Sequence, residues 1–266
     1  MKKLLCKTYL AILLLLLYAP IIFIGVFSFT ESKVLGNWTG FSTELYENLF
    51  FETGSGNGLL RAIENTFIIA LAAAFASTIL GTVAAMGLKN LKGYKRRAMQ
   101  FMNNIPMINP DIITGVSLFL LFIFLHVTQG YVSVILAHIT FCTPYVVLSV
   151  MPQLIQMEPN TYEVALDLGA RPSQALWKVV IPQLKGGMIS GFILAFTMSL
   201  DDFAVTFFTR GTIGLETLST YIYADARKGG LTPELRPLMT LIFLVVLILL
   251  LVRNIRINRN TTKAKA

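Results

Sequence analysis

Three aspartates lie inside long apolar stretches of this 266-residue chain. Asp111 follows Asn109 and Pro110, and Asp201 and Asp202 are adjacent within a later run. A carboxylate at membrane depth costs at least roughly a few kcal/mol, so such a residue is a candidate functional group. No Lys or Arg lies inside these stretches. We therefore predict that the three acids bind a cation, and an organic ammonium could also use aromatic faces.

Each aspartate also has a structural interpretation. Asp111 could begin a helix after Pro110, and Asp201 and Asp202 could form a buried ion pair or a cap with a partner subunit. Adjacent helical residues point about 100° apart. One acid of the pair could therefore face a pathway through the protein while the other faces a neighbouring helix.

No other set of residues indicates chemistry on this chain. His126 and His138 lack a companion ligand, and we expect ordinary interface or packing roles for both. Cys6 and Cys142 have no metal-binding spacing and no placement for an extracellular disulfide. Walker, G-x-S-x-G and H-E-x-x-H motifs are absent from the sequence. We predict a chain that is not an enzyme and holds no metal or cofactor, so that any ATP and Mg would bind a partner.

The composition is that of a polytopic membrane protein. Apolar residues make up 55% and charged residues 14%, against about 25% charged residues in soluble domains. A membrane-spanning helix needs about 20 apolar residues. The uncharged runs predict an all-α fold with six transmembrane helices, at about 8–30, 64–88, 100–126, 131–152, 184–208 and 236–253. We expect the first, which follows three lysines, to be retained rather than cleaved.

The basic residues predict the orientation of these helices. With both termini inside, the cytoplasmic segments hold 16 of the 22 Lys and Arg, as the positive-inside rule requires. The net charge of +8 is thus a topology effect and does not indicate nucleic-acid binding. Small residues recur at three- and four-residue spacing in 64–88, which predicts close helix packing or a dimer seam with a second subunit.

A polar stretch at 160–182 separates two apolar runs and predicts a helix-turn-helix. Asn160 and Glu163 form a capping-box pattern. Gly169 suits the left-handed position after a helix. A second helix would start at Pro172 and stop at Pro182. A small helix-turn-helix between two membrane spans is suited to contact a partner in the aqueous phase.

This stretch resembles the EAA loop of bacterial ABC-importer permeases, roughly E-A-A-x3-G-x9-I-x-L-P. Glu163, Ala165, Gly169 and Pro182 match that pattern, and Val164 replaces its second residue. The resemblance implies that Glu163, Val164, Ala165 and Gly169 couple the chain to a cytoplasmic ATPase dimer. Trp177 is a further candidate for that contact.

Further motifs resemble the C-type permease subunit of spermidine/putrescine importers. They are Ser199-Leu200-Asp201-Asp202-Phe203, Pro110-Asp111-Ile112 and the segment from His138 to Tyr145. The resemblance implies a polyamine substrate, a second permease subunit and an extracytoplasmic substrate-binding protein. It also implies a location in the bacterial inner membrane with both termini cytoplasmic.

These expectations give three segments and two rival functions. We expect a first transmembrane helix and outer loop at 1–61, a permease core at 62–253 with its coupling loop at about 158–182, and a cytoplasmic tail at 254–266. The first rival keeps the importer and changes the cargo to ferric iron or thiamine. The second is an ion-coupled secondary transporter in which Asp111, Asp201 and Asp202 bind protons or Na⁺.

Overall fold

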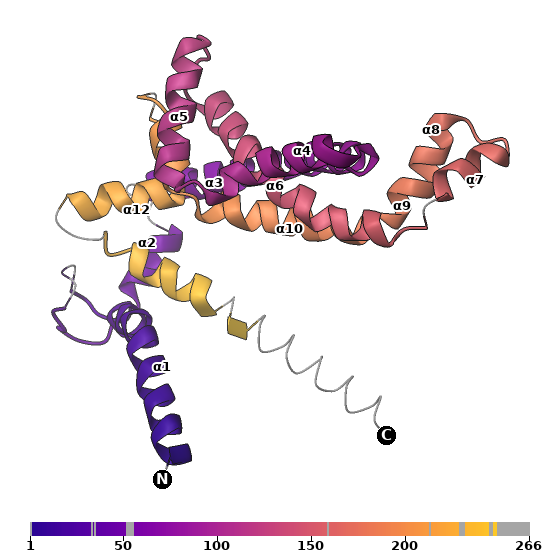
Figure 1. The fold of residues 1–266 in the computed structure, drawn as a ribbon. Helices are drawn as coiled ribbons and strands as arrows, with labels where there is room; N and C mark the ends of the chain where they lie inside the picture. Colours follow the sequence, from indigo (N-terminus) through magenta and orange to yellow (C-terminus); the bar gives the residue numbers. More distant parts are fainter. Residues whose placement is uncertain are drawn as a thin grey trace. The chain divides into compact units, whose positions relative to one another are not determined.

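The elements of regular secondary structure in the described part of the computed structural model are all helices (Figure 1). It describes residues 2–32, 34, 36–51, 56–158, 160–212, 214–228, 232–244 and 247–248. Within these residues the β contacts are limited to one isolated antiparallel bridge between Thr30 and Phe41. The prediction of an all-α fold is therefore confirmed.

The chain divides into two compact units. The core unit is Leu60–Tyr221, and the terminal unit combines Met1–Leu59 with Ile222–Ala266. In the terminal unit the buried Arg236 donates from Nη1 to the carbonyl oxygen of Ser32 at 2.9 Å, which ties the segment after the first helix to the last one. Helices of this unit are α1 (Lys2–Phe27), α2 (Glu44–Phe51), most of α12 (Leu218–Arg227) and a helix over Leu235–Leu244.

Three predicted spans coincide with single helices that are long and apolar enough to cross a membrane. They are α1, α3 (Gly56–Asn90) and α6 (Tyr131–Gln156). Two further candidates are bent pairs of helices, which raises the number of possible spans in the described residues to five. The predicted sixth helix at 236–253 is described only in part, because residues 245, 246 and 249–253 lie outside the described residues.

The prediction of one helix at 100–126 is wrong. The chain forms α4 (Gly93–Ile108) and α5 (Asp111–Phe124), which meet at a bend of 107°. Pro110 explains the break, because a proline ring disfavours helical backbone at the preceding residue. Asn109 is indeed extended, with φ −71° and ψ 137°. Pro106 remains inside α4 without ending it.

The prediction of one helix at 184–208 is also wrong. The helix α10 (Lys185–Asp201) stops where Asp202 turns to an extended backbone, with φ −62° and ψ 130°. A short helix, α11 (Ala204–Thr209), follows. The break therefore falls beside the paired aspartates.

Small residues on α3 form a packing face inside the core unit, as predicted. The buried positions recur every three or four residues, at Ala70, Ala73, Ala74, Ser77, Gly81 and Ala85. A Cβ added to Gly81 would lie 2.6 Å from Cβ of Val146 on α6, so only glycine permits this approach. Close backbone approach of this kind is how helices associate where lipid removes the hydrophobic driving force.

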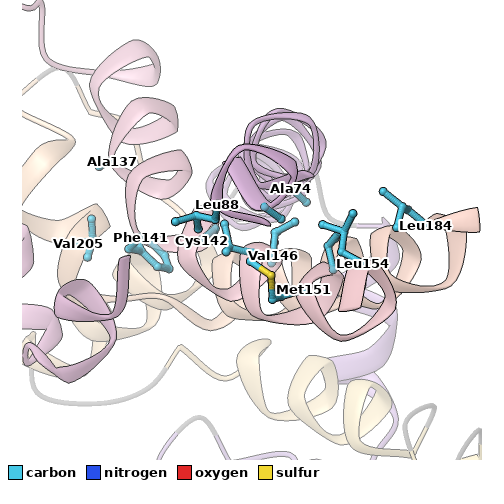
Figure 2. Close-up of a cluster of buried hydrophobic side chains, with 14 of the residues drawn as sticks. Ala74, Leu88, Ala137, Phe141, Cys142, Val146, Met151, Leu154, Leu184 and Val205 are labelled. Atoms are coloured by element: carbon cyan, nitrogen blue, oxygen red, sulfur yellow. Dashed lines mark hydrogen bonds between the residues drawn. The ribbon is translucent and has the colours of Figure 1, made fainter. Parts of the chain in front are cut away.

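The core cluster joins α3 to α6 and α10. Figure 2 shows Ala74 from α3 beside Val146 and Met151 from α6. Gly187 on α10 permits a similarly close approach to α6, since a Cβ added there would lie 2.9 Å from the carbonyl oxygen of Ser149. The packing of α3, α6 and α10 thus positions the end of α10, where the α10–α11 break lies.

Candidate functional site

A pocket lined by all three predicted aspartates lies in the core unit, where α10 ends and α5 begins. Its volume is about 430 Å³, within the range of about 300–1,000 Å³ typical of small-molecule sites. The lining residues are Asp111, Phe141, Met198, Asp201, Asp202, Phe203 and Ala204. We call this site the acidic pocket. It unites acids from distant parts of the sequence, and its lining contains no basic residue.

The two adjacent aspartates have different surroundings. Asp201, the last residue of α10, is exposed. The side chain of Asp202 retains only 7% of its accessible surface. Only Asp201 therefore offers a largely open carboxylate, which agrees with the divergence expected of neighbouring positions on a helix.

The carboxylate of Asp202 binds the beginning of α11. Its Oδ2 accepts hydrogen bonds from the backbone N–H and the hydroxyl of Thr206, both at 2.8 Å. Its Oδ1 accepts from the backbone N–H of Val205 at 3.3 Å. These N–H groups have no partner within the helix, and a negative charge is favourable at a helix N-terminus. The cap interpretation therefore fits Asp202, through contacts within this chain.

His138 completes the surroundings of Asp202, a role that the sequence analysis did not predict. The imidazole is fully buried on α6. Its Nδ1 lies 2.6 Å from Oγ of Ser199, and its Nε2 lies 2.9 Å from Oγ1 of Thr206. Nε2 is also 3.4 Å from Oδ2 of Asp202. The expectation of an ordinary packing role is incomplete, because this histidine links three helices.

Asp111 is the first residue of α5 and is exposed. It begins a helix, as its structural interpretation predicted, and it also lines the acidic pocket, where its binding of a cation stays a prediction. Two phenyl rings accompany the acids: Phe141 lies 5.2 Å from the His138 ring, and Phe203 lies 5.4 Å from Phe207, centroid to centroid. The pocket thus combines open carboxylates with aromatic and aliphatic walls.

The stretch predicted as a helix-turn-helix begins with α7 (Thr161–Asp167), and further short helices follow a turn at Gly169. Gly169 has φ 86°, as predicted. The N–H of Gly169 bonds to the carbonyl of Leu166, and that of Ala170 to the carbonyl of Ala165. This pair of bonds is the Schellman motif that ends a helix at a left-handed residue.

Two details of the helix-turn-helix prediction are wrong. The Asn160 side chain makes no cap hydrogen bond, because its backbone is at φ −96° and ψ 9° rather than extended. The second helix does not stop at Pro182, but runs through α8 (Pro172–Ala175), a π-helical turn η1 (Leu176–Val180) and α9 (Ile181–Gln183). The π turn widens the helix just before the proline that lacks an N–H.

Comparison with known proteins identifies the family. Residues 77–259 match the family described as the binding-protein-dependent transport system inner membrane component. The chain belongs to this family. It is thus a permease subunit of a transport system, which confirms the resemblance to ABC-importer permeases.

Curated relatives place the permease near polyamine transporters. It is 36% identical over 233 residues to the putrescine transport system permease protein PotI of Escherichia coli K12, covering 85% of this chain and 81% of that one. It is 34% identical over 244 residues to the spermidine/putrescine transport system permease protein PotC of Haemophilus influenzae, covering 92% and 93%. The predicted resemblance to spermidine/putrescine permeases is confirmed.

A solved structure supports the fold of the permease. A bacterial ABC transporter that imports the acidic polysaccharide alginate superposes with a TM-score of 0.65, covering 95% of each chain. The identity is 17%, so this likeness shows the fold alone.

The permease presents an apolar surface on its helix-turn-helix. Val164, Leu168 and Trp177 are exposed, and a pocket of about 450 Å³ lies between α7 and η1. Glu163 is also exposed, whereas Ala165, on the same helix, is buried. Of the predicted coupling residues, Glu163 and Val164 are therefore accessible to a partner, and Ala165 and Gly169 shape the loop that presents them.

Proposed function

We propose that this permease imports a polyamine and that the acidic pocket is part of its substrate path. The observation that supports the proposal is the meeting of Asp111, Asp201 and Asp202 with two phenyl rings in one pocket. Carboxylates would bind the ammonium groups of a polyamine, and Phe141, Phe203 and the aliphatic walls would contact its methylene chain. Cation–π attraction to the rings adds to this.

The three acids have different roles in this proposal. Asp111 and Asp201 are exposed in the pocket and would pair with ammonium groups of the cargo. The carboxylate of Asp202 already accepts three hydrogen bonds at the start of α11, so it would contribute mainly its charge. Polyamine relatives at 33–36% identity support this class of cargo.

The rest of the proposed machine follows from the family. The permease would pair with a second permease subunit, two ATPase subunits that bind ATP and Mg, and an extracytoplasmic binding protein. Six spans with both termini in the cytoplasm would place the helix-turn-helix at 158–182 on the ATPase side. Glu163, Val164 and Trp177, all exposed, would meet the ATPase there. The core boundaries at 62 and 253 remain part of this proposal.

Uptake of radiolabelled spermidine by cells carrying the whole transporter tests the substrate assignment. Asp201→Asn should lower uptake by up to about fivefold, since an exposed ion pair is worth up to about 1 kcal/mol. Asp201→Glu keeps the charge and should retain much of the activity. Glu44→Gln removes an exposed acid outside the pocket and serves as the control at matched membrane abundance.

The rivals predict other outcomes. If ferric iron or thiamine, rather than putrescine, competes with the labelled cargo, the importer assignment stands and the cargo assignment fails. If uptake persists without ATP and follows a proton or Na⁺ gradient, the chain acts as a secondary transporter. Normal uptake by both Asp111→Asn and Asp201→Asn would remove the acidic pocket from the substrate path.

A further inference from the structure

A chain of polar side chains crosses the core unit at the α10–α11 break. It runs from Ser199 on α10 through His138 on α6 to Thr206 on α11, and ends at Asp202. Ser199, His138 and Thr206 are all buried. Buried polar groups of this kind must be paired, since an unsatisfied one costs about 1–3 kcal/mol. All four members have a partner within the chain.

The donors and acceptors fix one direction for this chain. The Thr206 hydroxyl donates to Oδ2 of Asp202, so its oxygen must accept from Nε2 of His138. A neutral imidazole with its proton on Nε2 then has Nδ1 as an acceptor, and the Ser199 hydroxyl donates to it at 2.6 Å. This tautomer satisfies every member at once. We assign it from the bonding pattern.

The polar chain lies directly behind the acidic pocket. Asp202 belongs to both, and Asp201 precedes it in the sequence as the last residue of α10. The helix α11 also contacts the helix that begins with Asp111, because a Cβ added to Gly115 of α5 would lie 3.1 Å from the carbonyl oxygen of Ala204. The position of α11 therefore affects both open carboxylates.

We propose that His138 is a positioning residue for the acidic pocket: with Ser199 and Thr206 it holds Asp202 against α11, and so keeps Asp201 turned toward the cargo. The inference rests on the proposed function. In this proposal His138 and Asp202 together position the pocket, and the carboxylates of Asp201 and Asp111 bind the cargo.

A series of substitutions at His138 separates this role from simple space filling. Glutamine places its amide nitrogen where Nε2 lies and can donate to Thr206, whereas asparagine is too short and leucine has no donor. Uptake should therefore follow the order His, Gln, then Asn and Leu, with Leu lower than wild type by about tenfold. His126→Asn is the matched control: His126 is exposed at φ 55°, a backbone that asparagine tolerates.

A second readout reports the pocket without relying on transport. Asp201→Cys is introduced in a background with Cys6→Ser and Cys142→Ala, and the rate of alkylation by a small charged maleimide-type reagent is measured in membranes. His138→Leu should change the alkylation rate at position 201 several-fold, and His138→Gln should restore it. A cysteine at Ser173 in the same background is the reference, because it is exposed in the helix-turn-helix far from the break in sequence.

A double-mutant comparison completes the test. If His138 acts through Asp202, then His138→Leu combined with Asp202→Asn should lower uptake no further than the more severe single substitution. Multiplying losses, or equal uptake by the Leu and Gln variants with unchanged alkylation at 201, would overturn the inference. Normal uptake by both Asp111→Asn and Asp201→Asn instead contradicts the proposed role of the acidic pocket, while the alkylation result still decides whether His138 positions Asp201.

Discussion

Replacing Gly169 tests whether the helix-turn-helix transmits force to an ATPase. Gly169 has φ 86°, and a Cβ added there would meet nothing within 4 Å. The cost of Gly169→Ala is therefore backbone strain alone, about 1–2 kcal/mol for an L residue in left-handed backbone. Such a cost lowers the population of the native turn by a factor of about 5–30.

The position offers a graded series and a matched control. Asparagine tolerates left-handed backbone and should be mildest, alanine intermediate, and valine most severe because it is β-branched. Gly93 has φ 57° and also has nothing within 4 Å of an added Cβ. Gly93→Ala thus carries a similar backbone cost at the start of α4, away from the exposed apolar surface of the loop.

Two measurements, made on variants of equal membrane abundance, test whether the loop couples the permease to the ATPase. Co-purification of the ATPase with the permease and uptake of the cargo should both fall in the order Asn, Ala, Val at Gly169. The Gly93→Ala variant should keep both. A well-inserted Gly169→Val permease with normal ATPase association and uptake would refute the reasoning, and equal loss at both glycines would show a general folding defect instead.

Three further outcomes follow from the structure. Gly81→Ala should lower the thermal stability of the purified permease, since overpacking costs about 1–3 kcal/mol. Gly87→Ala on the same helix is the control, because an added Cβ there meets no neighbour and should not lower stability. Equal melting temperatures of the two variants would contradict the α3–α6 packing. Trp177→Ser should weaken ATPase association without lowering stability, because the indole is exposed; unchanged association would remove Trp177 from the contact. In a background with Cys6→Ser and Cys142→Ala, a cysteine at Asn37 should react with an impermeant reagent added outside and one at Ser173 should not; the reverse pattern would invert the proposed topology.

Local sequence patterns predicted much of the helix-turn-helix and missed some of its details. Gly169 ends α7 as predicted, because a left-handed residue is a local requirement that glycine meets without strain. Asn160 does not cap α7, because its backbone lies at φ −96° and ψ 9° instead of the extended conformation that a capping residue adopts. The residue types at a helix start do not by themselves determine that conformation.

The breaks in two predicted spans show a similar division. Pro110 marks a possible break, yet Pro106 and Pro144 lie inside continuous helices, so proline alone does not locate it. The break at Asp202 has no local cause in the apolar pattern. The break depends on Thr206 and His138, whose contacts with the Asp202 carboxylate stabilise an extended backbone at Asp202.

Composition and periodicity were enough to predict the all-α class, the apolar runs, the packing face of α3 and the divergence of Asp201 from Asp202. Each follows from periodicity or composition along one segment, where neighbours in sequence fix the geometry. In contrast, it is the packing of distant segments that brings Asp111 into one pocket with the later aspartates and places His138 beside Asp202. Such meetings depend on how bent helices pack against one another, and that packing is set by many weak contacts between distant segments.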